Sequence, residues 1–397
     1  MVGKSKKIEI LNENSTFGDI DEELVMLNIL PRLPINQIFK FKLVCKKWRN
    51  FISKATFVTT YNSINNPKNC PSSSTFYYLA DTDRVISSTD RDNQFQFPQP
   101  LGVILKGTFY VEGSTNGFLY GQCYHEKREI FVCNPITKQV VYIHKPKDLH
   151  TVSLAYDPHD TNGFGGFKIV GVYAFFDFHS KQFQFEVYSS KTGEWRTSNA
   201  PKLKVPLSDS YMRPCGSAYN RGKVYCLFTV NVIWFDVEKD IAGIVSCPDI
   251  LGQNLSLFPS NLGVCHEYGN GGEISYSRVT VEGRIKIWML KNAGGGGEFE
   301  WVIRHDLGLP VVCESIWNIL AGIHVSESVN KAVEHSKVSF PMPYLGGEEL
   351  WFWLSWRHHK GNLFSINMRS QELSFINCDL VSRYVWPFIP TLLPCSI

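Results

Sequence analysis

The sequence predicts a mainly β protein, in which a β-propeller of about six blades follows a small module of three helices. Two observations predict this fold class. Near residue 55 the apolar residues change from helical spacing to short alternating runs, and the alternating region contains a loose repeat. The chain has 397 residues, 44% of them hydrophobic, which is enough for two or three domains with a sizeable core.

Before residue 55 the apolar residues indicate three helical segments. A stripe at i, i+3, i+4 and i+7 spacing predicts one helix and contains Phe41, Val44, Cys45, Trp48, Phe51 and Ile52. Residues 24–33 predict an earlier helix that ends at Pro34, because proline cannot donate an intrahelical hydrogen bond. Residues 35–39 predict a short turn of helix between them.

These helices carry more apolar side chains than so small a module can bury. Domains below roughly 40 residues rarely sustain a core unaided. The surplus apolar surface indicates a docking face for a partner. The alternative is that the same residues form an internal helical core.

The region after residue 55 contains repeated pairs of strands. Each repeat has an apolar strand, a charged or glycine-containing turn and a second strand, and the turns centre near Thr137, Thr192, Lys239, Gly295 and Ser370. The gaps are 55, 47, 56 and 75 residues, and the first three are close to the length of a propeller blade. We expect the last gap to contain a long loop or an irregular blade.

Further strands lie between these hairpins and often follow a Gly or Asn turn, as in STNGFLYG and YNRGKVYC. We interpret them as the inner strands of the blades: residues 117–121, 167–173, 223–228, 273–277 and 350–354. An early unit from Phe76 to Val111 completes the count of about six blades. Radial repetition also protects strand edges, which suits a chain so rich in strands.

Composition excludes several classes of protein. The net charge is only +3, so no strong global field attracts nucleic acid or an anionic membrane, and no stretch approaches the roughly 18 apolar residues that span a bilayer. The 11 cysteines form no C-x-x-C pair, which argues against a disulfide framework and a thiolate zinc site. We expect reduced thiols, a cytoplasmic or nuclear location, and no nucleic-acid or membrane partner.

Possible chemical sites are weak. Gly294 to Gly297 lacks the Gly-Lys-Ser/Thr of a phosphate loop and predicts a hairpin loop, and NGFGGF lacks the spacing of a dinucleotide loop. His358-His359 could bind a metal or a carboxylate, but neighbours on a strand point to opposite faces. The basic run from Lys40 to Arg49 fits the solvated side of an apolar helix. We therefore expect no catalytic residue, no metal and no cofactor, although distant loops could still converge.

The helical segment and the repeated strand pairs together resemble a known family. LPINQIFKFKLVCKKWRNFIS, from Leu33 to Ser53, resembles the F-box motif, and STNGFLYG, NPITKQV, YSSKTGEW, FDVEKD and IKIWMLK resemble the F-box-associated, kelch-like domain of plant F-box proteins. The resemblance covers most of the chain from about residue 20. It implies a substrate-recognition subunit of an SCF (Skp, cullin, F-box) ubiquitin ligase. The module would bind a Skp-type adaptor and through it a cullin scaffold, and the propeller would recruit an unidentified protein substrate.

The resemblance also assigns docking residues. The adaptor-binding positions are Leu24, Leu33, Pro34, Ile38, Val44, Cys45 and Trp48, which would face the adaptor or support that face. The chain departs from the family where the first helix usually opens with Leu-Pro, since it has Ile20-Asp21 there. It also holds one residue more between Leu24 and Pro34, which rotates the preceding residues by about 100° unless a bulge absorbs the step.

The predicted organisation is a flexible N-terminus over residues 1–18, the helical module over 19–55, a linker over 56–73 and the propeller over 74–397. The implied mechanism is proximity of a held target to the conjugating enzyme, without catalysis by this chain. Two alternatives stay open. One is a propeller enzyme, such as a glycan-active oxidase or hydrolase, and the other is a glycan- or RNA-binding propeller whose helices serve as a structural plug.

Overall fold

The computed structural model describes residues 24–65, 76–79, 84–87, 95–96, 101–105, 108–123, 129–156, 166–176, 180–206, 214–228, 230–248, 260–265, 272–280, 284–293, 298–308, 338–356, 360–380, 385–388, 391–393 and 395. The chain divides into two compact units, Met1–Ile64 and Asn65–Ile397. The predicted flexible N-terminus over residues 1–18 lies outside the described residues, as do Gly294 to Gly297 and the His358-His359 pair. No helix in the described part of the chain is long and apolar enough to cross a bilayer.

The first unit is helical. Its elements are η1 (Val25–Ile29), η2 (Leu30–Arg32), α2 (Ile35–Phe41), α3 (Lys46–Ile52) and α4 (Ala55–Ile64). The prediction of one helix through residues 41–52 is wrong, because α2 ends at Phe41 and α3 starts at Lys46. Between them Cys45 has an extended backbone, and its Sγ accepts a hydrogen bond from the Trp48 amide at 3.4 Å, which caps the first turn of α3.

Helix α4 is a second difference from the prediction, which placed a linker from residue 56. The linker prediction is wrong for residues 56–64, because this segment is helical and contributes three buried side chains. Phe57, Val58 and Tyr61 are all buried, and the Phe57 ring packs edge-on against Phe51 of α3 at 5.4 Å. The three side chains are spaced as one face of a helix. The small helical unit therefore has a core of its own.

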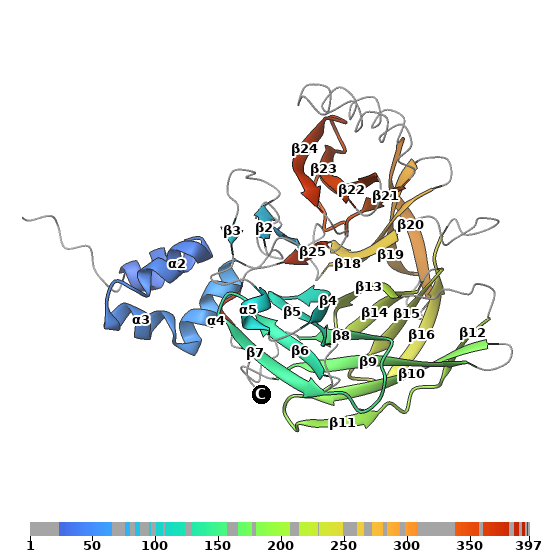
Figure 1. The fold of residues 1–397 in the computed structure, drawn as a ribbon, viewed down its shortest axis with the longest axis horizontal. Helices are drawn as coiled ribbons and strands as arrows, with labels where there is room; N and C mark the ends of the chain where they lie inside the picture. Colours follow the sequence, from blue (N-terminus) through green and yellow to red (C-terminus); the bar gives the residue numbers. More distant parts are fainter. Residues whose placement is uncertain are drawn as a thin grey trace, which may run out of the picture. The chain divides into compact units, whose positions relative to one another are not determined.

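The second unit is built of antiparallel sheets (Figure 1). The described residues form six sheets, five with four strands and one with five. The strands of the first three sheets are β1 (Phe76–Leu79), β2 (Arg84–Ser87), β3 (Phe95–Gln96), β4 (Phe109–Thr115), β5 (Phe118–Cys123), β6 (Glu129–Asn134), β7 (Gln139–His144), β8 (Thr151–Ala155), β9 (Lys168–Phe176), β10 (Ser180–Ser189), β11 (Glu194–Thr197) and β12 (Leu203–Pro206). The remaining strands are β13 (Pro214–Asn220), β14 (Lys223–Phe228), β15 (Asn231–Asp236), β16 (Ile241–Ser246), β17 (Ser260–Cys265), β18 (Glu273–Val279), β19 (Arg284–Ala293), β20 (Glu298–Gly308), β21 (Val338–Pro341), β22 (Glu349–Trp356), β23 (Lys360–Asn367), β24 (Leu373–Leu380) and β25 (Val385–Phe388). One short helix, α5 (Leu101–Ile104), precedes β4.

The sheets form a propeller that is closed by the end of the chain. Strand β25 pairs with β1, so the first blade has the order β25-β1-β2-β3 and combines both ends of the propeller sequence. The other blades are β4 to β7, β8 to β11 with β12 paired to β10, β13 to β16, β17 to β20, and β21 to β24. The prediction of a mainly β propeller of about six blades is confirmed. The early unit from Phe76 to Val111 gains its fourth strand from the C-terminal end.

The strands nearest the propeller axis are not the predicted ones. Strand β25 contacts β4, β4 contacts β8, β8 contacts β13, β13 contacts β17, and β17 contacts β21, so these strands lie innermost. The segments that we interpreted as inner strands are β5, β9, β14, β18 and β22, the second strand of each blade. The prediction is wrong by one strand, because a Gly or Asn turn such as Asn116-Gly117 joins the first strand to the second.

The repeat in the sequence corresponds to a recurring turn between the third and fourth strands. The αL residues Lys138, Gly193, Asp240 and Gln371 each lie four positions after the last residue of the third strand. In three of these blades that last residue is Asn or Asp. Its side chain accepts hydrogen bonds from amides two and three positions later, as Asp236 does from Glu238 and Lys239 at 3.2 and 2.9 Å. Asx side chains thus stabilise the repeated turn.

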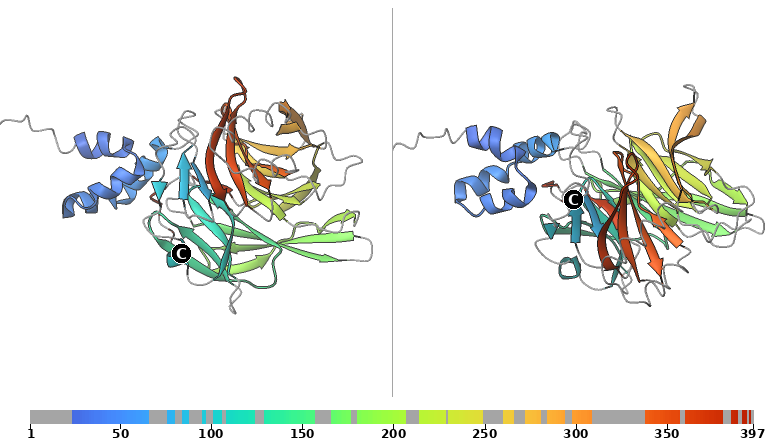
Figure 2. Two further views of the ribbon diagram at one scale, coloured as in Figure 1. Left: turned by 45° about the horizontal axis from the view of Figure 1, so that its top comes forward. Right: turned by 90° about the horizontal axis from the view of Figure 1, so that it is seen from above.

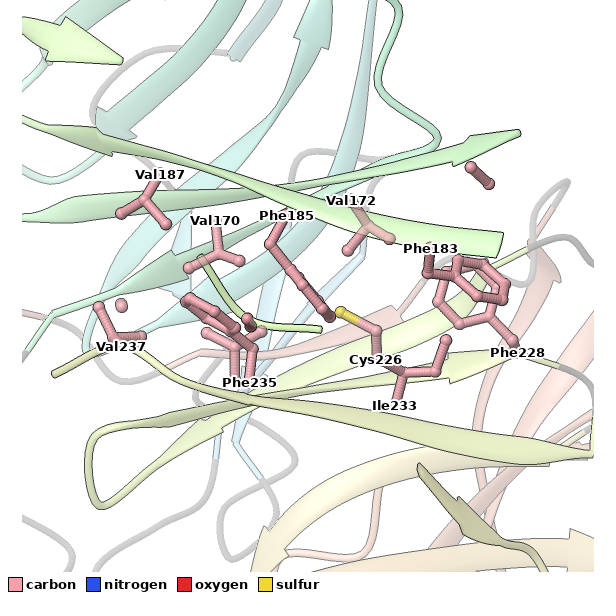
Figure 3. Packing of buried hydrophobic residues seen from close by; sticks show 14 of the residues in the cluster. Val170, Val172, Phe183, Phe185, Val187, Cys226, Phe228, Ile233, Phe235 and Val237 are labelled. Atoms are coloured by element: carbon pink, nitrogen blue, oxygen red, sulfur yellow. The ribbon is translucent and has the colours of Figure 1, made fainter. Parts of the chain in front are cut away.

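Apolar side chains fill the space between neighbouring blades. One cluster lies between the third and fourth blades and combines β9 and β10 with β14 and β15 (Figure 3). Phe185 of β10 stacks on Phe235 of β15 with ring centroids 4.6 Å apart, and Phe183 lies 4.9 Å from Phe228. The hairpin of β9 and β10 extends outward past its neighbours (Figure 2). Side chains alternate along these strands, so one face packs on the fourth blade, and on the opposite face Ile169 and Glu186 are buried as well.

The end of the chain packs on the second blade. Asn134, at the end of β6, donates hydrogen bonds to the carbonyl oxygens of Thr391 and Leu393 at 3.0 and 2.8 Å. The Cys395 amide donates to Gln139 at 2.9 Å. All of these contacts join residues more than 250 positions apart, so they supplement the β25–β1 pairing in closing the propeller.

Candidate docking module

The helical unit combines a buried core with apolar side chains that remain exposed. The buried set comprises Met26, Leu30, Ile35, Ile38, Ile52, Phe57, Val58 and Tyr61. The exposed set comprises Leu24, Leu27, Ile29, Leu43 and Val44, with exposed fractions of 50%, 51%, 43%, 77% and 62%. The alternative of an internal helical core thus holds for the buried set, and the exposed set lies outside that core. The exposed side chains fall in two segments, one before Pro31 and one between α2 and α3, and clustered exposed apolar side chains are typical of interaction sites.

The structure separates the predicted adaptor-binding residues into three groups. Leu24, Pro34, Val44 and Cys45 are exposed, and a partner could contact them directly. Leu33 and Trp48 are partly buried, and the Trp48 ring packs against Phe41 at 5.2 Å. Ile38 is fully buried, so it belongs to the core of the module and is not available to a partner.

Leu43 is the most exposed apolar residue of the module and was missed by sequence analysis. A continuous helix through residues 41–52 would place it away from the stripe of Val44 and Trp48. In the structure Leu43 and Val44 lie in the turn between α2 and α3, where helical periodicity does not apply. The sequence does show two adjacent apolar residues, Leu43 and Val44, close to the basic pair Lys46-Lys47. Their exposure follows only from the break between α2 and α3.

The first helical segment contains a π-helical turn, the kind of bulge that the extra residue between Leu24 and Pro34 calls for. The Leu30 amide donates to the Val25 carbonyl, five residues back, which makes η1 a π-helical turn. Pro31 follows and lacks an amide hydrogen, and the chain tightens into the 3₁₀ turn η2. A π-turn accommodates one additional residue per turn. It is therefore the bulge that can absorb the extra residue between Leu24 and Pro34.

Charge is unevenly distributed along the first unit. Residues 1–64 contain ten Lys and Arg and six Asp and Glu, and all six acidic residues precede Leu24, whereas residues 65–397 contain 30 basic and 31 acidic residues. Lys42 extends over the Phe39 ring at 5.6 Å, and burial lowers the pKa of its ammonium group. Arg49 donates through Nε to the Lys42 carbonyl at 3.2 Å. The exposed residues Leu43 and Val44 therefore lie among basic residues, which favours a partner with an acidic surface.

Both units match known families. Residues 22–59 match the F-box domain, and residues 97–383 match the family described as F-box protein At3g26010-like, beta-propeller. The first match extends past the predicted end of the module at residue 55 and into α4. The second covers more than half of the chain and includes all of the blades except the strands before residue 97 and the last strand.

Individual proteins support the same assignment. F-box protein At5g07610 of Arabidopsis thaliana is 29% identical over 250 residues, which cover 58% of this chain and 57% of the relative. F-box protein At5g49610 of the same plant is 24% identical over 249 residues, which cover 58% of this chain and 66% of the relative. The match thus spans between half and two thirds of each of these relatives.

Among solved structures, TolB from Acinetobacter baumannii matches 79% of this chain and 66% of its own chain, with 8% identity and a TM-score of 0.43. This similarity is too low to bear on function. The family matches, the propeller closed by β25 and the helical unit with its exposed apolar residues agree with one another. The chain belongs to the plant F-box proteins that carry an At3g26010-like β-propeller.

Proposed function

We propose that this chain is a substrate-recognition subunit of an SCF-type ubiquitin ligase. In this function the helical module docks on a Skp-type adaptor, which links it to a cullin scaffold, and the propeller holds a protein that is to be ubiquitinated. The chain contributes proximity, because it raises the effective concentration of the target beside the conjugating enzyme. The target contacts the propeller, and no bond is made or broken by residues of this chain.

The observation that carries the proposal is the exposure of Leu43 and Val44 in a module that already has its own core. Their side chains are not needed to fold the module, yet they lie in water beside Cys45, which matches the F-box motif. Burial of one such side chain in an interface contributes about 1.5 kcal/mol or more. Two or three of them, surrounded by basic side chains, suit a partner with an apolar pocket and an acidic rim.

Binding of the purified full-length chain to a purified Skp-type adaptor tests the proposal. The variant Val44→Asp places a carboxylate in the contact, and desolvation of this charge adds to the lost apolar burial. A loss of about 2 kcal/mol or more corresponds to at least about thirtyfold weaker binding. Biolayer interferometry measures this change directly.

Val103→Asp is a matched control, because Val103 lies on α5 of the propeller and is 63% exposed, against 62% for Val44. The control variant should bind the adaptor as tightly as the original chain. Pro34→Ala and Trp48→Ala should also weaken binding. The proposal is overturned when the original chain captures no adaptor, or when Val44→Asp and Val103→Asp bind it equally well. The first outcome favours the alternative in which the helices are a structural plug.

A further inference from the structure

Strands β9, β10 and β12 carry an outward face that combines lysines with aromatic rings. Along β9, Val170, Val172 and Ala174 point into the core, so Tyr173 and Phe175 point to the opposite side. Register places Gln182 of β10 opposite Phe175, and Lys204 of β12 opposite Gln182. We call this surface, formed by Lys147, Tyr173, Phe175, Gln182, Lys202 and Lys204, the lysine–aromatic face.

The lysines of this face are held close to the aromatic rings. Lys202 Nζ lies 4.8 Å from the centre of the Phe175 ring, and Lys147 Nζ lies 4.9 Å from that of Tyr173. The two rings are themselves 5.9 Å apart. Each cation–π contact at a partly exposed site is worth about 0.5–1 kcal/mol and orients the ammonium group without neutralising it. The face therefore presents two adjacent aromatic rings, each with a lysine ammonium group against it.

The positive charge of the face is only partly compensated. Lys147 pairs with the buried carboxylate of Glu186, which also accepts from Thr197 at 3.1 Å. Within the described ranges, neither Lys202 nor Lys204 forms an ion pair, and both are exposed. Residues 66–397 as a whole are nearly neutral, with 30 basic and 31 acidic residues. The two free ammonium groups are therefore a local feature and not part of a general basic field.

We propose that the lysine–aromatic face binds an acidic, extended peptide segment of the target protein. Carboxylates of the segment would pair with Lys202 and Lys204, while its backbone and aliphatic groups would lie on the Tyr173 and Phe175 rings. Nucleic acid is a poorer fit, because a polyanion gains little from a propeller without net positive charge. The inference rests on the proposed function for the identity of the bound segment as part of a target.

Fluorescence anisotropy with the full-length chain tests this inference. The probe is a fluorescein-labelled peptide of ten glutamates, and the comparison ligands are a peptide of ten lysines and a ten-nucleotide single-stranded DNA. The double variant Lys202→Glu and Lys204→Glu reverses two exposed charges and should raise the Kd of the glutamate peptide at least about tenfold. Phe175→Leu keeps an apolar side chain but removes the ring, and should raise the Kd about threefold.

The double variant Lys138→Glu and Lys239→Glu is the control, because these exposed lysines lie in turns of two other blades. It changes the net charge of the chain by the same amount and should leave the Kd within twofold of the original. Three results overturn the inference: the glutamate peptide binds no better than the lysine peptide, the control reduces binding as much as the test variant, or DNA binds more tightly and competes. Adaptor capture through the helical module is measured separately, so its failure leaves this result interpretable.

Discussion

Substitution of Asn134 should release the C-terminal segment from the second blade. The Asn134 side chain is fully buried and makes four hydrogen bonds. It donates to the carbonyl oxygens of Thr391 and Leu393 and accepts from the amides of Ile136 and Thr137. Asn134→Ala leaves three well-buried partners, Thr391, Leu393 and Ile136, without this hydrogen bond. At about 1 kcal/mol for each, the expected loss in the free energy of unfolding is about 3 kcal/mol.

A turn with the same local role provides the control. Asn367 accepts from the amides of Arg369 and Ser370 at 3.0 and 2.9 Å, in the equivalent turn of the last blade, and among the described residues its side chain forms no hydrogen bond with the C-terminal segment. Both of these amides belong to exposed residues. Asn367→Ala should therefore cost about 1 kcal/mol or less. The difference between the two variants measures the contribution of the bonds to Thr391 and Leu393.

Urea unfolding followed by tryptophan fluorescence gives both free energies, and carboxypeptidase digestion reports release of the C-terminal residues. Asn134→Asp offers a further check, because its second oxygen would face two carbonyl oxygens and could donate only when protonated. This variant should be at least as unstable as Asn134→Ala at pH 7 and should recover in part at lower pH. Equal losses for Asn134→Ala and Asn367→Ala would refute the role assigned to the C-terminal contacts.

Two further substitutions test the electrostatics of buried groups. Burial raises the pKa of Glu112, against the opposing effect of hydrogen bonds from the Val152 amide and from Thr151. Between the ordinary glutamate pKa of about 4.3 and the raised value, the folded state binds more protons than the unfolded chain, so the free energy of unfolding falls as pH rises. Glu112→Gln should therefore gain stability relative to the original chain between pH 4 and pH 8 in urea unfolding, and a constant difference would contradict this. Arg278 is 2% exposed, and among the described residues its three guanidinium nitrogens form no hydrogen bond and no ion pair with a carboxylate. Arg278→Met should raise the free energy of unfolding by about 1 kcal/mol or more, whereas a loss of that size would show that the charge is compensated.

The second unit was predictable because its sequence repeats a local rule. The turns near Thr137, Thr192, Lys239 and Ser370 were located correctly as hairpin turns, and the structure places each of them between the third and fourth strands of a blade. Asx residues and αL positions act within five residues of sequence, so their effect can be read without knowledge of the rest of the fold. The assignment of inner strands failed, because the order of strands around the axis depends on contacts between blades and not on any single hairpin.

The same division between local pattern and tertiary contact holds for the helical module. Helical spacing identified Val44, Cys45 and Trp48, and the family resemblance added Leu24, Leu33, Pro34 and Ile38. The pattern could not separate residues that fill the core from those that reach solvent, because both are apolar and share the same spacing. The break at Cys45 and the added helix α4 decide that Ile38 is buried while Leu43 and Val44 are exposed.

The sequence by itself determined the fold class, the order of helical module and β region, and the positions of the repeated turns, since these depend on local periodicity and on turn residues. Only the tertiary structure decided that β25 completes the first blade, that Asn134 holds Thr391 and Leu393, and that Tyr173, Phe175, Lys202 and Lys204 share one face. These features join residues that are distant in sequence. Such pairings are selected by how whole sheets pack around one axis, and no local pattern encodes that packing.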